Sequence, residues 1–135
     1  MTEQLVRDAM VSEPIALDAS ATAQEAAEAL ARDAVRSVFV CEDGALLGVV
    51  TRKTLVREVV AGGLDPTIAT AGSIAEPPNA TVSSTMLLAD AFAFLEAQDY
   101  ERVPVVEGGK LVGVLSRSAL QRRLAEDESP AVLEP

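Results

Sequence analysis

The sequence predicts an α/β (α+β type) protein made of two pseudo-symmetric halves, each with the order strand, helix, strand, strand, helix, packed sheet to sheet. The main observation is an internal repeat: residues 38–55 and residues 103–120, 65 positions further on, share one pattern. Each has an apolar run, a glycine turn, a second apolar run containing Gly, a hydroxyl residue and a helix-like segment. Because a three-stranded sheet rarely stands alone, two copies packed sheet to sheet would close the core.

The first half begins with helical spacing of apolar residues within 1–12, and a brief strand is expected at 15–17, after Pro14. Thr22 followed by Glu25 is typical of a capping box, which predicts the start of a helix. The apolar face of this helix is expected at Ala23, Ala26, Ala27, Leu30 and Ala34.

Two further strands are expected at 38–41 and 46–50, joined by a hairpin turn at 42–44. Gly48 inside the second strand indicates a bulge or a close approach of backbone. Thr51 is a natural N-cap for a helix that runs to about residue 61 and ends at Gly62 and Gly63.

The second half repeats this order, with a helix face at Leu88, Ala91, Phe92 and Leu95 and with Ser116 as the cap. The predicted boundaries are 5–62 for the first repeat, 63–73 for a linker, 74–125 for the second repeat and 126–135 for an acidic mobile tail. A helical turn is expected near Ser73 and Ile74.

Composition excludes several classes of protein. A chain of 135 residues with a net charge of −10 is expected to form one compact domain and to avoid non-specific nucleic-acid binding. With no apolar stretch approaching 18 residues, the chain is expected to be cytoplasmic and not membrane-bound. There is no His, and we find neither metal-ligand spacing nor a catalytic constellation, so neither a metal site nor an enzyme is predicted. Cys41 is expected to be a buried structural thiol.

The duplicated helix start is the candidate functional feature. Thr51 and Ser116 each precede a helix, where free backbone N–H groups and a hydroxyl can hold an anion. Both residues would cap a helix whether or not a ligand binds, so two interpretations stay open. Arg52 and Arg117, unfavourable for the helix dipole at first-turn positions, are either anion contacts or solvated surface residues.

The motifs Val38-Phe39-Val40 with Gly48-Val49-Val50-Thr51, and Val103-Pro104-Val105-Val106 with Gly113-Val114-Leu115-Ser116, resemble the tandem CBS-domain pair, or Bateman module, over about residues 5–125. The resemblance implies a regulatory module that requires no cofactor and whose clefts between repeats take adenosine-type ligands: AMP, ADP, ATP or S-adenosylmethionine. It also implies that modules pair.

The resemblance implies two sets of ligand-binding residues. Those of the first repeat are Pro14, Ile15, Ser37, Val38, Phe39, Thr51, Arg52 and Thr54. Those of the second repeat are Ala80, Thr81, Arg102, Val103, Pro104, Ser116, Arg117 and Ala119. Thr54 and Ala119 stand where the family has a ribose-binding Asp, and Arg102 either contacts phosphate or forms a surface ion pair.

Two functions are therefore weighed. The first is a module that senses an adenosine-type nucleotide and signals to a separate, unidentified protein by conformational change. The second is a ligand-free dimerisation and interaction scaffold, which the two missing Asp residues favour. A homodimer is expected from apolar helix positions, namely Leu55, Val56, Val59, Val60, Leu120 and Leu124.

Overall fold

The computed structural model describes residues 4–12, 14–123 and 125. The chain forms two compact units. The first-repeat unit comprises residues 14–79 and 109–111, and the second-repeat unit comprises the described part of residues 1–13, 80–108 and 112–135. Each unit combines helices with strands, which confirms the predicted α/β class. The predicted tail, 126–135, lies outside the described residues.

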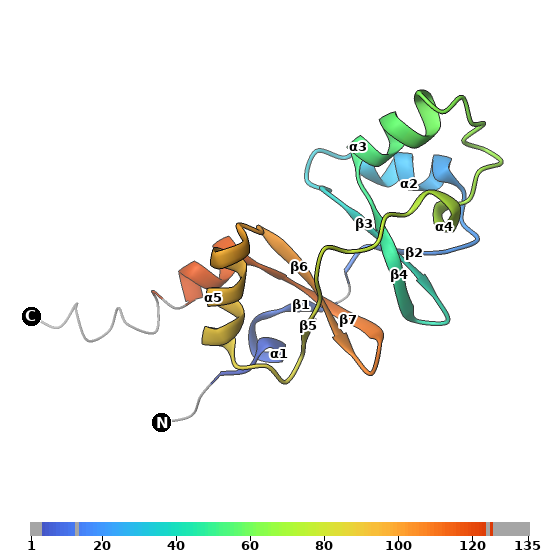
Figure 1. The fold of residues 1–135 in the computed structure, drawn as a ribbon. Helices are drawn as coiled ribbons and strands as arrows, with labels where there is room; N and C mark the ends of the chain where they lie inside the picture. Colours follow the sequence, from blue (N-terminus) through green and yellow to red (C-terminus); the bar gives the residue numbers. More distant parts are fainter. Residues whose placement is uncertain (1–3, 13, 124, 126–135) are drawn as a thin grey trace, which may run out of the picture. The chain divides into compact units, whose positions relative to one another are not determined.

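The first-repeat unit contains the predicted order of strand, helix, strand, strand and helix, followed by a short additional helix (Figure 1). Strand β2 runs parallel to β3, and β3 is antiparallel to β4. The helix after β4 starts as α-helix and continues as π-helix. The bounds are β2 Ala16–Asp18, α2 Ala23–Leu30, β3 Val38–Glu42, β4 Ala45–Val50, α3 Arg52–Thr54, η1 Leu55–Val60 and α4 Ala71–Ile74.

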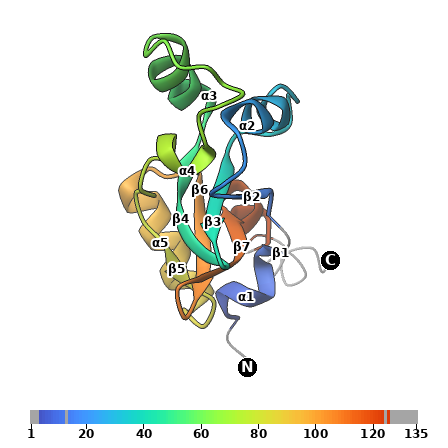
Figure 2. The ribbon, with the colours of Figure 1, turned by 90° about the vertical axis from the view of Figure 1, so that its right-hand side faces the viewer.

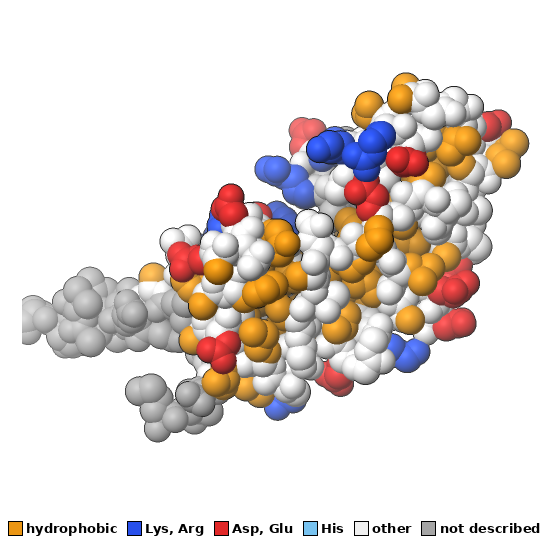
Figure 3. Space-filling model, viewed as in Figure 1, with side chains coloured by type: hydrophobic (Ala, Val, Ile, Leu, Met, Phe, Trp, Pro, Cys, Tyr) orange, Lys and Arg blue, Asp and Glu red, His pale blue; other side chains and the backbone are white. Residues whose placement is uncertain are grey.

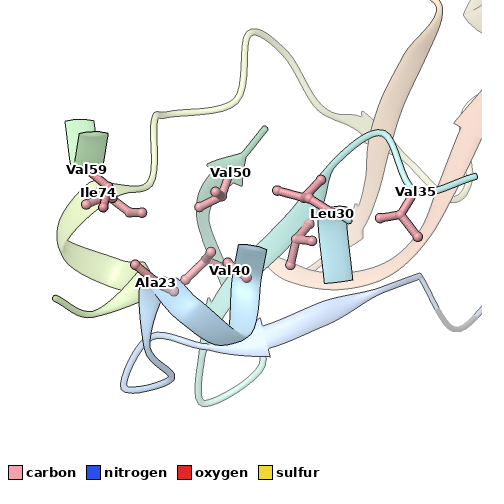
Figure 4. Close-up of a cluster of buried hydrophobic side chains, with 10 residues drawn as sticks. Ala23, Leu30, Val35, Val40, Val50, Val59 and Ile74 are labelled. Carbon is pink, nitrogen blue, oxygen red and sulfur yellow. The ribbon is translucent and has the colours of Figure 1, made fainter. Parts of the chain in front are cut away.

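The core of this unit consists of small and branched aliphatic side chains, and Figure 4 shows how they converge from α2, β3, β4, η1 and α4. Its buried members are Ala23, Ala26, Leu30, Val35, Val38, Val40, Val50, Val59, Ala71 and Ile74. The predicted face of α2 is wrong at one position, because the helix ends at Leu30 and Ala34 is exposed in the following turn. Val35, in the connection to β3, fills the core instead.

The second-repeat unit has the strand order β5-β6-β7-β1, with α5 beside the strands (Figure 2). Its core is formed by Val6, Val82, Leu88, Ala91, Leu95, Val103, Val105, Leu115 and Leu120. The bounds are α1 Val6–Ala9, β1 Val11–Ser12, β5 Val82–Ser83, α5 Leu88–Gln98, β6 Arg102–Glu107 and β7 Lys110–Ser116, and residues 117–123 are helical. Lys110, at the start of β7, pairs with Ala45 within the first-repeat unit.

The short helix that precedes each repeat packs in the unit of the other repeat. α1 and α4 occupy equivalent positions, 65 residues apart, yet α1 belongs to the second-repeat unit and α4 to the first. Val6 of α1 is fully buried in the second core, and Ala71 of α4 is fully buried in the first. Residues 71–73, within the expected linker, are therefore helical, and Ala71 is part of the core of the first-repeat unit.

The extended segments after these helices explain the two strand glycines. A Cβ on Gly48 would lie 2.5 Å from the backbone oxygen of Glu76, and a Cβ on Gly113 would lie 2.8 Å from that of Val11. Both distances are shorter than any stable contact, so only glycine allows the segments to cross. The close approach predicted at Gly48 is confirmed, and a register shift between Val40 and Cys41 adds a bulge to the same hairpin.

Candidate functional site

The helix start of the first repeat is built around a reciprocal pair of threonines. Thr51 is the N-cap of α3, and its Oγ1 accepts a hydrogen bond from the backbone N–H of Thr54 at 3.3 Å. In return, the Oγ1 of Thr54 accepts from the backbone N–H of Thr51 at 3.1 Å. The predicted cap at Thr51 is confirmed, and Thr54 completes a capping box with a hydroxyl where such a box usually has Glu or Gln.

Thr54 is buried, with 1% of its surface exposed, and its hydroxyl also donates to Oε1 of Glu76 at 3.0 Å. Because an ionised carboxylate only accepts, the hydroxyl proton of Thr54 belongs to this bond. The hydroxyl of Thr51, 3.0 Å away, must then donate to Thr54 Oγ1. The guanidinium of Arg57 also binds Glu76 Oε1, so Arg57 and the Thr54 hydroxyl share one carboxylate oxygen.

Two backbone N–H groups at this helix start remain open. Those of Arg52 and Lys53 donate to none of the described residues, whereas the next N–H, of Thr54, is capped. The Arg52 guanidinium donates to the backbone oxygen of Arg32 at 3.0 Å, just beyond the C-terminal end of α2. A guanidinium there is favoured by the negative end of the helix dipole.

Basic side chains gather around this helix start, and Figure 3 shows blue side chains over α3. Five exposed basic residues of the first-repeat unit come from the α2–β3 connection and from α3 and η1, namely Arg32, Arg36, Arg52, Lys53 and Arg57. They are five of the 11 Lys and Arg residues in a chain of net charge −10, so positive charge is concentrated here. Open N–H groups beside cationic side chains are suited to a phosphate.

The helix start of the second repeat has the same cap but no open N–H group. Ser116 Oγ accepts from the backbone N–H of Ala119 at 3.0 Å, which confirms the predicted cap. The N–H of Arg117 donates to the backbone oxygen of Glu101 at 2.7 Å. The N–H of Ser118 donates at 3.4 Å to Glu101 Oε2, which also accepts from the Ser118 hydroxyl at 3.1 Å.

Arg117 is likewise engaged by carboxylates of its own unit. Its NH1 donates to Asp99 Oδ1 at 3.2 Å, and its Nε lies 3.9 Å from Glu101 Oε1. Asp99 ends α5 in the left-handed conformation, with φ +58°, which directs the chain toward β6. The Arg117 side chain is thus bound by carboxylates of its own unit.

The other predicted ligand residues have varied surroundings. Val38 and Val103 are 0% and 1% exposed and belong to the two cores, so a ligand could meet only their backbone. Phe39 and Pro104 are also buried, and Pro14, Ser37, Ala80 and Ala119 are half-buried. Ile15, Thr81 and Arg102 are exposed, and Arg102 forms no ion pair with a described residue. Within the first-repeat unit, the Ile15 backbone oxygen accepts from Phe39 N–H at 3.0 Å.

Glu76 and Glu101 were not predicted. A comparison of the two repeats contains a signal for both: Glu76 corresponds to Val11, and Glu101 corresponds to Arg36, a reversal of charge. In the first repeat, the Thr54 hydroxyl donates to the carboxylate of Glu76. Its counterpart in the second repeat, Ala119, has no hydroxyl that could donate to a carboxylate.

Cys41 is half-buried on β3, opposite Asp18 of β2. Burial raises the pKa of the Cys41 thiol above its ordinary value, and the charge of Asp18 raises this pKa further. Hydrogen bonds from the Ser20 hydroxyl and N–H lower the pKa of Asp18, which keeps its carboxylate charged. Both effects favour the neutral, poorly nucleophilic thiol.

The two units therefore contain duplicated, hydroxyl-capped helix starts on a strand-helix-strand-strand-helix scaffold, which is the architecture of a tandem domain pair. A family model described as "CBS domain" matches residues 6–61 and 71–126. The chain belongs to the CBS domain family, with two copies of the domain.

Individual relatives agree with this assignment. Hypoxic response protein 1 of Mycobacterium tuberculosis is 29% identical over 106 residues, which cover 78% of this chain and 74% of that protein. The crystal structure of Hypoxic Response Protein I with two coordinated zinc ions has a TM-score of 0.75 at 27% identity and covers 88% of this chain and 98% of that one. The crystal structure of CBSX2 in complex with AMP has the same TM-score at 25% identity, and covers 92% of this chain and 98% of that one.

Two further properties of the described residues bear on function. They contain no group of three or more His, Cys, Asp or Glu side chains arranged to hold a metal ion. Over the same part of the chain, every helix is too short or too polar to cross a membrane.

Proposed function

We propose that this chain is a regulatory module that binds an adenosine-type nucleotide in the cleft predicted between its two CBS repeats. Binding would change its conformation and signal to a separate protein. The observation that carries the proposal is the helix start of the first repeat, where the Arg52 and Lys53 N–H groups are open beside the Thr51 cap and several cationic side chains. The similar CBSX2 structure contains AMP, which supports an adenosine-type ligand. The module itself is proposed to be non-catalytic.

Calorimetry with adenosine, AMP, ADP, ATP and S-adenosylmethionine tests this function. We expect AMP or a more highly phosphorylated nucleotide to bind more tightly than adenosine, because phosphate gains charge-assisted bonds at Arg52 and Lys53. Arg52→Ala keeps the open N–H but removes the guanidinium beside it. If the guanidinium contacts the phosphate, this variant should weaken AMP by roughly tenfold to a hundredfold, the equivalent of a bond worth about 1.5 to 3 kcal/mol, and leave adenosine nearly unchanged.

Arg102→Ala applies the same test to the exposed arginine of the second repeat, whose side chain is free of ion pairs with the described residues. If Arg102 contacts phosphate, the loss should grow with the number of phosphates. Arg7→Ala is the control, because Arg7 is an exposed cation of α1 with no predicted ligand role. No binding of any of the five compounds by the full chain would rule out the proposed function.

A ligand-free dimerisation scaffold is the second candidate, and exposed apolar side chains on η1 favour it. Val56 and Val60 of η1 are 60% and 74% exposed, and Ile68, in the connection between η1 and α4, is 75% exposed. Of the other residues expected at a homodimer interface, Leu55 is half-buried, Val59 and Leu120 are buried in the cores, and Leu124 lies outside the described residues. A homodimer through η1 is compatible with either function.

A further inference from the structure

The two repeats differ most at the first turn of the helix that follows the capping residue. At equivalent positions, 65 residues apart, the N–H groups of Arg52 and Lys53 are open within the described chain, whereas those of Arg117 and Ser118 both donate to Glu101. The two capping hydroxyls are the same in kind, so the caps do not account for this difference. Glu101 does.

Glu101 occupies the place that an external anion would take. Its backbone oxygen and Oε2 accept from successive N–H groups of the first turn, at 2.7 and 3.4 Å, and Oε2 accepts from the Ser118 hydroxyl as well. Its Oε1 lies 3.9 Å from the Arg117 guanidinium. A carboxylate at the positive end of a helix satisfies the dipole and the arginine at once.

A second carboxylate completes the neutralisation. Asp99 binds the other side of the Arg117 guanidinium, at 3.2 Å. The two carboxylates together carry one more negative charge than Arg117 can balance. A phosphate brought to this helix start would have to displace the Glu101 side chain from Ser118 and would still face both carboxylates, at separations where like charges repel strongly.

In the first repeat, the charge is reversed at one of these two positions and absent at the other. The residue equivalent to Glu101 is Arg36, and the residue equivalent to Asp99 is Ala34. Both are exposed, and neither places a negative charge near Arg52. The same scaffold therefore presents a cationic helix start in one repeat and a self-neutralised one in the other.

We propose that Glu101 is a specificity-determining residue, which acts as an internal anion and closes the second repeat to phosphate-bearing ligands. Phosphate-bearing ligands are thereby confined to the first repeat, and the helix start of the second repeat admits an uncharged nucleoside at most. The identity of the ligand rests on the proposed function, whereas the closure by Glu101 rests on the contacts at Arg117 and Ser118.

The test uses the full ¹⁵N-labelled chain, with inorganic phosphate and AMP as separate probes and the amide signals of Arg117 and Ser118 as the readout. In the unmodified protein, neither probe should shift these two signals. Glu101→Gln removes the charge but leaves the backbone oxygen of residue 101 bonded to the Arg117 N–H. In this variant both probes should shift the Ser118 signal in a saturable manner, with an affinity at least about tenfold higher than in the unmodified protein. Glu96→Gln, on an exposed position of α5, is the charge-matched control and should behave as the unmodified protein.

Asp99→Asn provides a second variant, because the Asp99 side chain is 91% exposed and its replacement should not disturb folding. It should give a smaller gain of phosphate binding, since Glu101 remains in place. Saturable shifts at Ser118 in the unmodified protein, or no gain in both Glu101→Gln and Asp99→Asn, would overturn the closure by Glu101. The phosphate arm gives this answer even if AMP binds nowhere, so failure of the proposed function is distinguishable.

Discussion

The buried hydroxyl of Thr54 offers a direct test of the polar cluster in the first repeat. Thr54→Val keeps the size and branching of the side chain but removes the oxygen that accepts from the Thr51 N–H at 3.1 Å and donates to Glu76 at 3.0 Å. At 1% exposure, water cannot replace these bonds without rearrangement. The variant leaves the Thr51 N–H without an acceptor and takes one donor from Glu76.

The expected cost follows from these two losses. An unsatisfied buried donor costs about 1 to 3 kcal/mol and a lost cap about 0.5 to 2 kcal/mol, and since both describe overlapping groups, we expect about 2 kcal/mol in total. For 135 residues, an unfolding entropy of about 2.1 cal/mol/K per residue gives about 0.28 kcal/mol/K, so the midpoint should fall by about 7 °C. Calorimetric melting, checked by urea denaturation, measures this.

Two matched variants separate the hydroxyl from other effects. Thr85→Val removes the hydroxyl of an exposed threonine and should change the free energy of unfolding by less than about 0.5 kcal/mol. Glu76→Gln keeps an acceptor for Thr54 and removes only the half-exposed ion pair with Arg57, worth about 0 to 1 kcal/mol. If Thr54→Val and Thr85→Val have the same midpoint of thermal unfolding, the Thr54 hydroxyl contributes nothing to stability and the reasoning about the cluster is wrong.

Two further predictions concern the surface of η1 and the thiol of β3. Light scattering should give about twice the chain mass of 14.1 kDa for the unmodified protein. Val56→Lys should give the mass of the monomer, because it places a charge in the exposed apolar surface of η1. A monomer at every concentration of the unmodified protein would count against the dimer. Cys41 should react with a disulfide reagent at pH 8 more slowly than a free thiol, because its pKa is raised. Asp18→Asn should accelerate the reaction, because it removes the charge that helps to raise the pKa of Cys41. An unchanged or slower rate in Asp18→Asn would contradict this.

Local patterns gave the order of elements and the capping residues of the site. The caps at Thr22, Thr51 and Ser116 were predictable because each binds a backbone N–H three residues away. The hairpin turns were predictable for a similar reason: Asp43 and Gly44 in one, and Gly108 and Gly109 in the other, all have positive φ. Such features depend on residues adjacent in sequence, so the sequence by itself determines them.

The charges around the site required the tertiary structure. Glu76 reaches Thr54 across 22 residues, and Glu101 reaches Ser118 across 17, so neither contact has a fixed spacing by which it could be recognised. The packing of α1 and α4 in the units of the opposite repeats is also non-local, because either helix could have covered its own repeat. The sequence placed a hydroxyl at both helix starts, and long-range contacts decided which start kept its N–H groups free, because a helix terminus binds whichever carboxylate the fold brings to it.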